Sequence, residues 1–337
     1  MDDIRTEPAP ACPACGGSGP LELTGLRDRL HGVAGTWSFR RCSRCRSLWL
    51  DPRPAVDDVA RLYPSEYFTH DPAAVGAGAA AGWRSKARSL VLSSRYGYPG
   101  EASLLGRLLS LVPSARERAT FLNSPVFPTW VTGGRVLDVG CGSGAFLELL
   151  RSLGWIVAGV EPDPPAREAA ASRGIQVAAT LEEIADRPGF DFVTMSHVLE
   201  HVPDPIAFLT SASELLKEGG RLLVVTPNAA SLGSRRFGAD WFALEVPRHL
   251  AVYSPAGARA ILGRIALLHD PRVTTSARIA GKMARERERV RRHGNFKVEG
   301  PLGFASGVAR PRAFAAIEVL ARTAVPVGEE LVLEATR

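Results

Sequence analysis

The chain lacks a long hydrophobic run. Among its 337 residues no stretch approaches 18 uninterrupted apolar residues, and the first thirty have no basic start followed by an apolar core. A membrane-spanning helix needs about 20 apolar residues, and a signal peptide needs that basic and apolar start. We therefore expect a cytoplasmic globular protein with neither a membrane span nor a membrane partner.

Internal repeats and a strong charge are also missing. The 33 glycines and 25 prolines are spread along the chain, without the period of a solenoid. A net charge of +6 is mild for a dedicated nucleic-acid binder, and the arginine run 285–292 contains Glu286 and Glu288, as on a solvated helix face. The length and the 45% hydrophobic content favour two domains and at least one sizeable core.

Cysteine is scarce, and four of the five cysteines lie before residue 46. They form two Cys-x-x-Cys pairs, Cys12 with Cys15 and Cys42 with Cys45, and each pair can turn two thiolates onto one metal ion. A disulfide framework is disfavoured because no secretory signal is found. A redox pair is disfavoured because neither pair lies in a βαβ pattern. We predict a structural zinc ion with four cysteine ligands.

Short apolar runs alternate with helical stretches from residue 135 onward, which predicts a doubly wound parallel sheet. In such a sheet the ligand lies at the carboxyl ends of the strands. A last strand, 328–336, is expected to run antiparallel, whereas the stretch 266–307 stays unassigned. The predicted strands are 135–139, 155–161, 191–195 and 221–226, and the predicted helices are 145–153, 165–173 and 205–217, the last ending at Gly219 and Gly220.

A glycine-rich loop connects the first of these strands to its helix. Gly140, Gly142 and Gly144 allow the backbone to approach a ligand, and the following helix presents free N–H groups. Glu161 ends the next strand, where a carboxylate can accept hydrogen bonds from both ribose hydroxyls of a nucleoside. The same glycine spacing also satisfies the looser dinucleotide pattern, so a dehydrogenase stays open at this point.

Two strings around this loop resemble one family. Val-Leu-Asp-Val-Gly-Cys-Gly-Ser-Gly has an acid two residues before its first glycine, and Ser-His-Val-Leu-Glu-His-Val-Pro-Asp-Pro follows the strand 191–195. Together they resemble class I S-adenosylmethionine-dependent methyltransferases, including the branch with quinone-biosynthesis O-methyltransferases and sugar methyltransferases. The resemblance covers about residues 133–262. It implies a cofactor site formed by Asp138, Gly140, Cys141, Gly142, Gly144, Glu161, His197 and Leu199.

Individual roles follow from that resemblance. Asp138 and the glycine loop would hold the methionine part of the cofactor, and Glu161 would hold its ribose. His197 and Leu199 would line the cofactor, whereas Cys141 would only fill the loop. The cysteine-rich front, with Leu-Trp-Leu-Asp-Pro-Arg-Pro after it, resembles the zinc-containing methyltransferases of glycan and deoxysugar pathways.

The resulting architecture is a Rossmann-like α/β fold with a seven-stranded sheet. It would comprise a zinc module at 1–70, a helical connector or cap at 71–130 and a methyltransferase domain at 131–337. A helix at 104–111 in the connector is a candidate dimer surface.

Four residues are candidates for the catalytic chemistry, which needs in-line positioning and a base for any proton on the acceptor. His201 is the first, with an N-terminal cap of the helix near Pro205 as the structural alternative. His249 and Glu245 follow the strand 221–226, with an ion pair packing the loop as the alternative. Tyr67 would reach the pocket from the zinc module, or anchor the contact between the domains.

The expected function is methylation of a small hydroxylated or keto metabolite, such as a nucleotide-linked sugar, with no nucleic-acid partner. An RNA base methyltransferase is the first alternative, because the chain is basic and zinc ribbons accompany such domains. Against it, no Asn-Pro-Pro-Tyr type motif follows the strand 191–195. A noncatalytic zinc-dependent binding protein is the second alternative, and the intact glycine loop argues against it.

Overall fold

The computed structural model describes residues 4–63, 83–111, 127–185, 188–277, 279–295 and 327–337. The chain divides into two compact units, each described here by itself. The first combines residues 1–65, 197–210 and 226–335, and the second combines residues 66–196, 211–225 and 336–337. Within the described residues, no helix has the length and apolarity needed to cross a bilayer.

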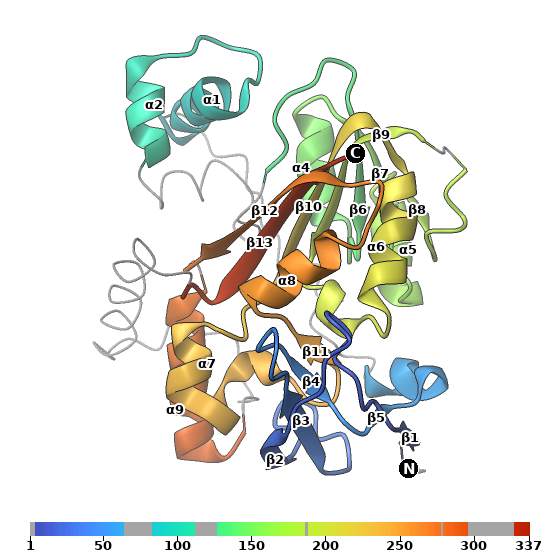
Figure 1. Cartoon of the computed structure of the whole chain (residues 1–337). Coiled ribbons are helices and arrows are strands. Elements are labelled where there is room, and N and C mark those ends of the chain that lie inside the picture. Colours follow the sequence, from blue (N-terminus) through green and yellow to red (C-terminus); the bar gives the residue numbers. More distant parts are fainter. Residues whose placement is uncertain (1–3, 64–82, 112–126, 186–187, 278, 296–326) are drawn as a thin grey trace. The chain divides into compact units, whose positions relative to one another are not determined.

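A seven-stranded, mostly parallel sheet has the order β12-β13-β10-β9-β6-β7-β8 (Figure 1). Strands β6 to β10 pair in parallel, and one antiparallel strand completes the predicted Rossmann-like fold. The strands are β6 (Arg135–Val139), β7 (Ile156–Val160), β8 (Gln176–Ala178), β9 (Phe190–Ser196), β10 (Leu216–Pro227), β12 (His269–Ser276) and β13 (Glu330–Thr336).

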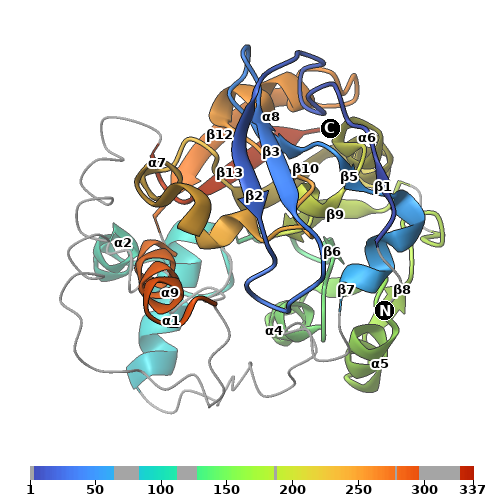
Figure 2. The same cartoon turned by 90° about the horizontal axis from the view of Figure 1, so that it is seen from below.

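The strands of the second unit form where apolar residues run without interruption. Val136 to Val139 are all buried, as expected for a parallel strand covered on both faces. The helices α4 (Ala145–Ser152) and α5 (Pro164–Ser172) lie on one side of β6, β7 and β8 (Figure 2). These elements agree with the predicted ones to within a residue or two.

Two predictions about the chain after β9 are wrong. Helix α6 (Pro205–Glu214) ends three residues early, and Gly219 and Gly220 lie inside β10 rather than at a helix cap. There Gly219 has φ +76°, its N–H donates to the Arg337 carbonyl, and the Arg337 N–H donates to the Gly220 carbonyl. The strand β12 occupies part of the stretch that was left unassigned.

The first unit is built around a second, four-stranded sheet with the order β11-β4-β3-β2. Trp37, Phe39 and Leu50 from this sheet join Trp241 and Met283 in one buried apolar cluster. Residues near the N-terminus therefore fold together with residues beyond 226. The strands are β2 (Leu21–Leu26), β3 (Trp37–Arg41), β4 (Leu48–Leu50) and β11 (Ala251–Val252), and a separate pair consists of β1 (Thr6–Glu7) and β5 (Arg53–Pro54).

The remaining described helices lie between these strands along the chain. Two of them, α1 (Trp83–Tyr96) and α2 (Leu104–Leu111), fall in the predicted connector, where a helical structure was expected. The others are α7 (Leu232–Phe237), α8 (Pro255–Leu262) and α9 (Ala280–His293), with short 3-10 turns η1 (Val56–Leu62), η4 (Leu199–His201), η5 (Gly238–Asp240) and η6 (Phe242–Leu244).

Candidate functional site

The four N-terminal cysteines converge on one point. The Sγ atoms of Cys12 and Cys45 are 3.6 Å apart, those of Cys15 and Cys42 are 3.4 Å apart, and all four lie within 4.8 Å of one another. A zinc ion bound about 2.3 Å from each sulfur needs separations of roughly 3.8 Å. The same distances are far too long for a disulfide bond of about 2.05 Å, and all four are free thiols. The donor set therefore fits a structural zinc ion.

The cysteine knuckles pack against the N-terminus of α8. The Ser254 hydroxyl donates to the Cys45 carbonyl and accepts the Gly257 N–H at 3.0 Å, which caps the helix. A Cβ on Gly257 would lie 3.4 Å from both the Cys45 sulfur and Ala14. The candidate zinc site is thus part of the core of the first unit.

The glycine loop in the second unit connects β6 to α4 through backbone conformations that favour glycine. Gly140, Gly142 and Gly144 have φ values of +73°, +54° and +79°, where other residues are strained. A Cβ on Gly144 would lie 2.9 Å from the Ala170 Cβ and 2.7 Å from Ile175, so its absence also lets α4 and α5 approach. The predicted approach of this loop to a ligand remains a prediction.

Two buried carboxylates flank this loop at the ends of adjacent strands. Glu161 accepts the Gly142 N–H at 2.8 Å and the Asp163 N–H at 3.0 Å, one at each oxygen. Asp138 accepts the Thr194 hydroxyl at 2.6 Å. Burial, and secondly the charge of Glu161, raise the pKa of Asp138 to about 7. An acid at the position of Glu161 suits the ribose of either cofactor class, whereas the second buried carboxyl, Asp138, favours a cationic ligand when it is ionised.

Cys141 has the space-filling position expected of it. Its side chain packs with Leu147 and Ile175 in a small apolar cluster, and burial raises the pKa of its thiol. Leu199, in η4 of the first unit, is fully buried. Its proposed contact with the cofactor remains a prediction.

His197 follows β9 directly and lies between two carboxylates of the first unit. Its Nδ1 is 3.1 Å from Glu200 Oε1, and its Nε2 is 3.2 Å from Glu330 Oε1. Burial alone would lower the pKa of His197, but the two carboxylates outweigh it and raise the pKa to about 9. Its φ of +57° is unusual for a residue other than glycine, and such strain clusters at functional sites.

His201 and His249, also in the first unit, form a compact pair. Their rings meet edge to face with centroids 4.7 Å apart. His201 Nδ1 is 3.0 Å from the Arg248 carbonyl oxygen, and His249 Nδ1 is 2.8 Å from the Ala243 carbonyl oxygen. Because a carbonyl oxygen only accepts, each Nδ1 carries the hydrogen, which leaves Nε2 as the atom that can take a proton.

Carboxylates surround this pair. His249 Nε2 lies 3.6 Å from Glu245 Oε2 and 3.9 Å from Glu200 Oε1. Burial, followed by the charge of His249, lowers the pKa of His201 to about 4, so this ring is neutral near pH 7. The ligand atoms of Glu200, His201 and His249 lie within 4.8 Å of one another, so the three groups can share a proton or a divalent cation.

Of the two structural alternatives for these residues, one is absent and one is present. The cap of α6 is Asp204, whose Oδ1 accepts the N–H groups of Ile206 and Ala207, so His201 does not cap that helix. The ion pair expected on the other loop exists, since Arg248 Nε donates to Glu245 Oε1 at 3.0 Å.

Tyr67 lies outside the described residues. A tyrosine four residues earlier, Tyr63, places its hydroxyl 2.9 Å from His201 Nδ1. Glu200, whose Oε1 lies 3.1 Å from His197 Nδ1 and 3.9 Å from His249 Nε2, was not among the predicted site residues. Its place in the Glu-His string beside His201 is the signal that could have identified it.

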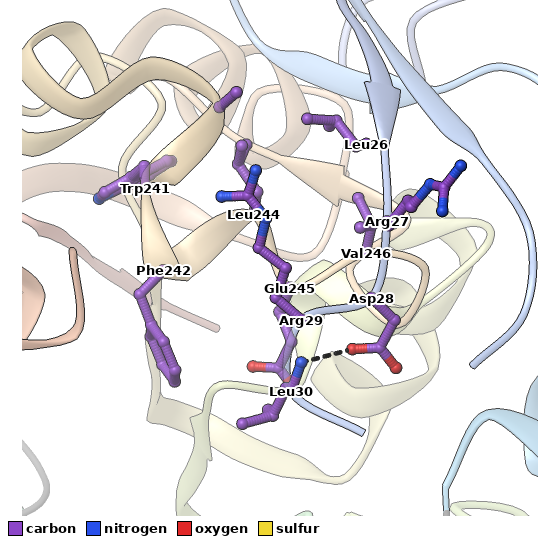
Figure 3. Close-up of a pocket in the computed structure, with 11 residues that line it drawn as sticks. Leu26, Arg27, Asp28, Arg29, Leu30, Trp241, Phe242, Leu244, Glu245 and Val246 are labelled. Atoms are coloured by element: carbon purple, nitrogen blue, oxygen red, sulfur yellow. Dashed lines mark hydrogen bonds between the residues drawn. The ribbon is translucent and has the colours of Figure 1, made fainter. Parts of the chain in front are cut away.

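Arg248 anchors this loop through a pair that the sequence did not predict. Its guanidinium donates two 2.8 Å hydrogen bonds to the two oxygens of Asp28, and both side chains are buried. Asp28 and Glu245 also line a small pocket that is open to solvent (Figure 3). Its other lining residues come from the end of β2 and from η5 and η6, and they are Leu26, Arg27, Arg29, Leu30, Ala239, Trp241, Phe242, Leu244 and Val246.

The sheet and its helices define a Rossmann-like domain, with the glycine loop directly after β6. Residues 114–264 match the family described as "Methyltransferase domain". The match covers less than half of the chain, and over these residues the chain is similar to methyltransferase domains.

Curated relatives match about a third of the chain. The ubiquinone biosynthesis O-methyltransferase of Xanthomonas euvesicatoria pv. vesicatoria is 37% identical over 129 residues, which are 35% of this chain and 54% of the relative. The protein of that name from Xanthomonas oryzae pv. oryzae is 36% identical over 129 residues, with the same coverage. The chain thus spans about half the length of the curated relatives it matches.

Solved structures resemble the chain more distantly. An S-adenosylmethionine-dependent methyltransferase from Archaeoglobus fulgidus has 18% identity and a TM-score of 0.43, covering 73% of this chain and 98% of its own. One from Mesorhizobium loti has 18% identity and a TM-score of 0.41, covering 61% and 92%. Likenesses at this level carry no argument about function.

Proposed function

We propose that the protein transfers a methyl group from S-adenosylmethionine to a hydroxyl oxygen of a small-molecule acceptor. The observation that carries the proposal is the glycine loop between two buried acids, Asp138 and Glu161. A carboxyl at Asp138, beside the first glycine, suits a ligand with a sulfonium and an ammonium group, and it is not part of the dinucleotide pattern that Glu161 and the glycines also satisfy. Glu161 would accept the ribose hydroxyls, and Asp138 would attract the methionine ammonium. His197 and Leu199 are proposed to line the cofactor.

The acceptor chemistry is assigned to the first unit. The acceptor oxygen would attack the methyl carbon, the sulfur would keep the electron pair of the broken bond, and the acceptor proton would move to a base. His201 and His249 are the proposed bases, because each Nδ1 is anchored on a carbonyl and each Nε2 is directed elsewhere. Glu245 borders both this pair and the pocket, so that pocket is the proposed acceptor site.

The class of acceptor follows from two lines of support. The curated relatives are named O-methyltransferases, which favours a hydroxylated small molecule. The cysteine-rich front resembles methyltransferases of glycan pathways, which makes a nucleotide-linked sugar the alternative acceptor to test. The free thiols of the candidate zinc site suit a reducing compartment, so a cytoplasmic location is part of the proposal.

Binding and turnover assays test the proposal. Calorimetry should detect S-adenosylmethionine and its demethylated product but not NAD. Methyl-labelled cofactor is then offered with catechols, nucleotide-linked sugars and RNA. Labelling of a small-molecule hydroxyl is the expected result. Labelling of RNA bases alone, or binding of NAD without S-adenosylmethionine, would overturn the proposal.

Variants of the two histidines test the base. His201→Ala or His249→Ala, whichever removes the base, should lower the transfer rate by about 10² to 10⁴ and leave cofactor affinity unchanged. His269→Ala is the matched control, because His269 is exposed on β12. Since the pKa of His201 is about 4, a His201 base predicts a rate at saturating cofactor that holds from pH 7 to about 5. Full activity in both variants would refute the assignment.

A further inference from the structure

Helix α2 in the second unit has an inverted distribution of side chains. Its buried residues are Gly106 and Ser110, the two smallest positions of its sequence. Four leucines face outward instead, with exposed fractions of 74% at Leu104, 58% at Leu105, 54% at Leu108 and 70% at Leu111. A surface helix normally buries its apolar face.

The inversion results from the packing of α2 on α1. A Cβ on Gly106 would lie 2.4 Å from the Leu90 carbonyl oxygen and 2.3 Å from Ser94 Oγ, so only glycine permits the contact. Ser94 Oγ accepts the Ser103 N–H at 3.0 Å, and Ser103 Oγ accepts the Gly106 N–H at 3.0 Å. Small and polar residues therefore fill the contact between the two helices and direct the leucines away from it.

The end of α1 is joined to the sheet of the second unit by an aromatic cluster. The Tyr98 hydroxyl accepts the Trp155 Nε1 hydrogen at 2.8 Å and donates to the Pro128 carbonyl at 3.2 Å. Trp130 packs against the Tyr98 and Trp155 rings, at centroid distances of 5.2 and 5.5 Å. The leucines are therefore displayed on an anchored helical pair.

The α1–α2 pair as a whole carries charge of one predominant sign. Residues 83–111 contain five basic residues and one acidic residue, and Lys86, Arg95 and Arg107 are exposed. A second copy would bring the same positive charges together. The leucines also expose on the order of 450 Å², whereas a stable dimer buries about 800 Å² on each partner. An anionic surface with an apolar interior satisfies both the charge and the leucines.

We infer that the α1–α2 pair docks on an anionic lipid membrane, with the leucines of α2 in the acyl boundary and the neighbouring cations at the headgroups. No membrane partner is expected from the sequence when only membrane-spanning segments and signal peptides are considered. Docking of a surface helix on a membrane is a different mode of binding. The inference does not depend on the proposed methyl transfer.

Vesicle flotation tests it on the full chain. The protein should bind vesicles in which about a third of the lipid is phosphatidylglycerol and bind pure phosphatidylcholine weakly. Replacing Leu104, Leu108 and Leu111, which lie on one helix face, by Gln should lower binding at least about 100-fold. Arg107→Gln should lower it about fivefold, with a smaller difference at high salt. Leu21→Gln, at an exposed leucine of β2, should change nothing.

Each other result counts against the inference. Absence of vesicle binding would overturn it, as would full binding by the triple variant, because another surface would then be responsible. A solution dimer that the triple variant dissociates, without vesicle binding, would assign the patch to a second copy. Thermal unfolding and cofactor binding of each variant verify that the fold is intact.

Discussion

Glu161→Ala is the substitution for which the structure gives the most detailed expectation. The substitution would remove the proposed charge-assisted hydrogen bonds between this carboxylate and the ribose hydroxyls. Their loss should weaken cofactor binding by about 1.5–3 kcal/mol. The substitution would also release the Gly142 N–H, which now lies 2.8 Å from Oε2. Because the loop must be rebuilt before the cofactor binds, we add about 1 kcal/mol. The total, about 2.5–4 kcal/mol, is a loss of affinity of roughly 70- to 900-fold.

The stability of the variant separates this effect from simple unfolding. Loss of the hydrogen bonds to Gly142 and Asp163 should cost about 1–3 kcal/mol in the free energy of unfolding. Glu161→Gln should weaken cofactor binding nearly as much as Ala, since its NH₂ group would face a backbone N–H. Glu148→Ala is the control. Its half-exposed carboxylate pairs with Arg173 on the neighbouring helix, so affinity should not change.

Calorimetry well below the unfolding temperature provides the measurement, with denaturant unfolding alongside it. Cofactor affinity within twofold of the parent in Glu161→Ala would refute the assignment of the ribose to this residue. If the drop in cofactor affinity were fully explained by a smaller fraction of folded protein, Glu161 would only stabilise the loop and would not bind the ribose.

Three further predictions concern the metal, the core and the pH response. Elemental analysis should find one zinc per chain, and Cys42→Ser should release it and lower the unfolding temperature; a metal-free parent of unchanged stability would contradict this. Asp28→Asn should lower the free energy of unfolding by about 3–5 kcal/mol, because it weakens the buried ion pair with Arg248. Asp240→Asn is the control, since it changes a half-exposed ion pair with Arg29 and should cost at most about 1 kcal/mol. Asp138, whose pKa is raised to about 7, is neutral at lower pH. Affinity for cationic S-adenosylmethionine should therefore be full above pH 7 and fall up to tenfold per pH unit below it. A flat pH profile by calorimetry, or the same slope in Asp138→Asn, would contradict this role.

The sequence predicted the second unit well because its signals are local. A buried strand, a glycine loop, a helix and a carboxylate follow one another within residues 135–161, and each is encoded by neighbouring residues. The four-cysteine site could be predicted for the same reason, because Cys-x-x-Cys spacing fixes the ligand geometry within each pair. In both cases a short segment carries the whole physical constraint.

The predictions failed where distant residues decide the structure. The pair between Asp28 and Arg248 joins positions 220 residues apart, and neither segment alone indicates it. Strand β12 has a polar, largely exposed sequence, His-Asp-Pro-Arg-Val-Thr-Thr-Ser, so no apolar alternation marks it. The early end of α6 was missed because a Gly-Gly pair usually ends a helix, whereas here Gly219 lets the strand β10 bend and bond to Arg337.

The location of the cysteines gives the candidate zinc ion a role beyond its own knuckles. Cys45 is followed by β4, which pairs with β11 through Trp49 and Ala251, and β11 begins two residues after His249. The Leu50 N–H also donates to the Leu250 carbonyl at 2.9 Å. All of these residues belong to the first unit, whereas the glycine loop and Glu161 belong to the second. Loss of zinc should therefore disturb the histidine pair before it disturbs the cofactor loop, so a zinc-free protein that keeps cofactor affinity and loses transfer would follow directly from this division.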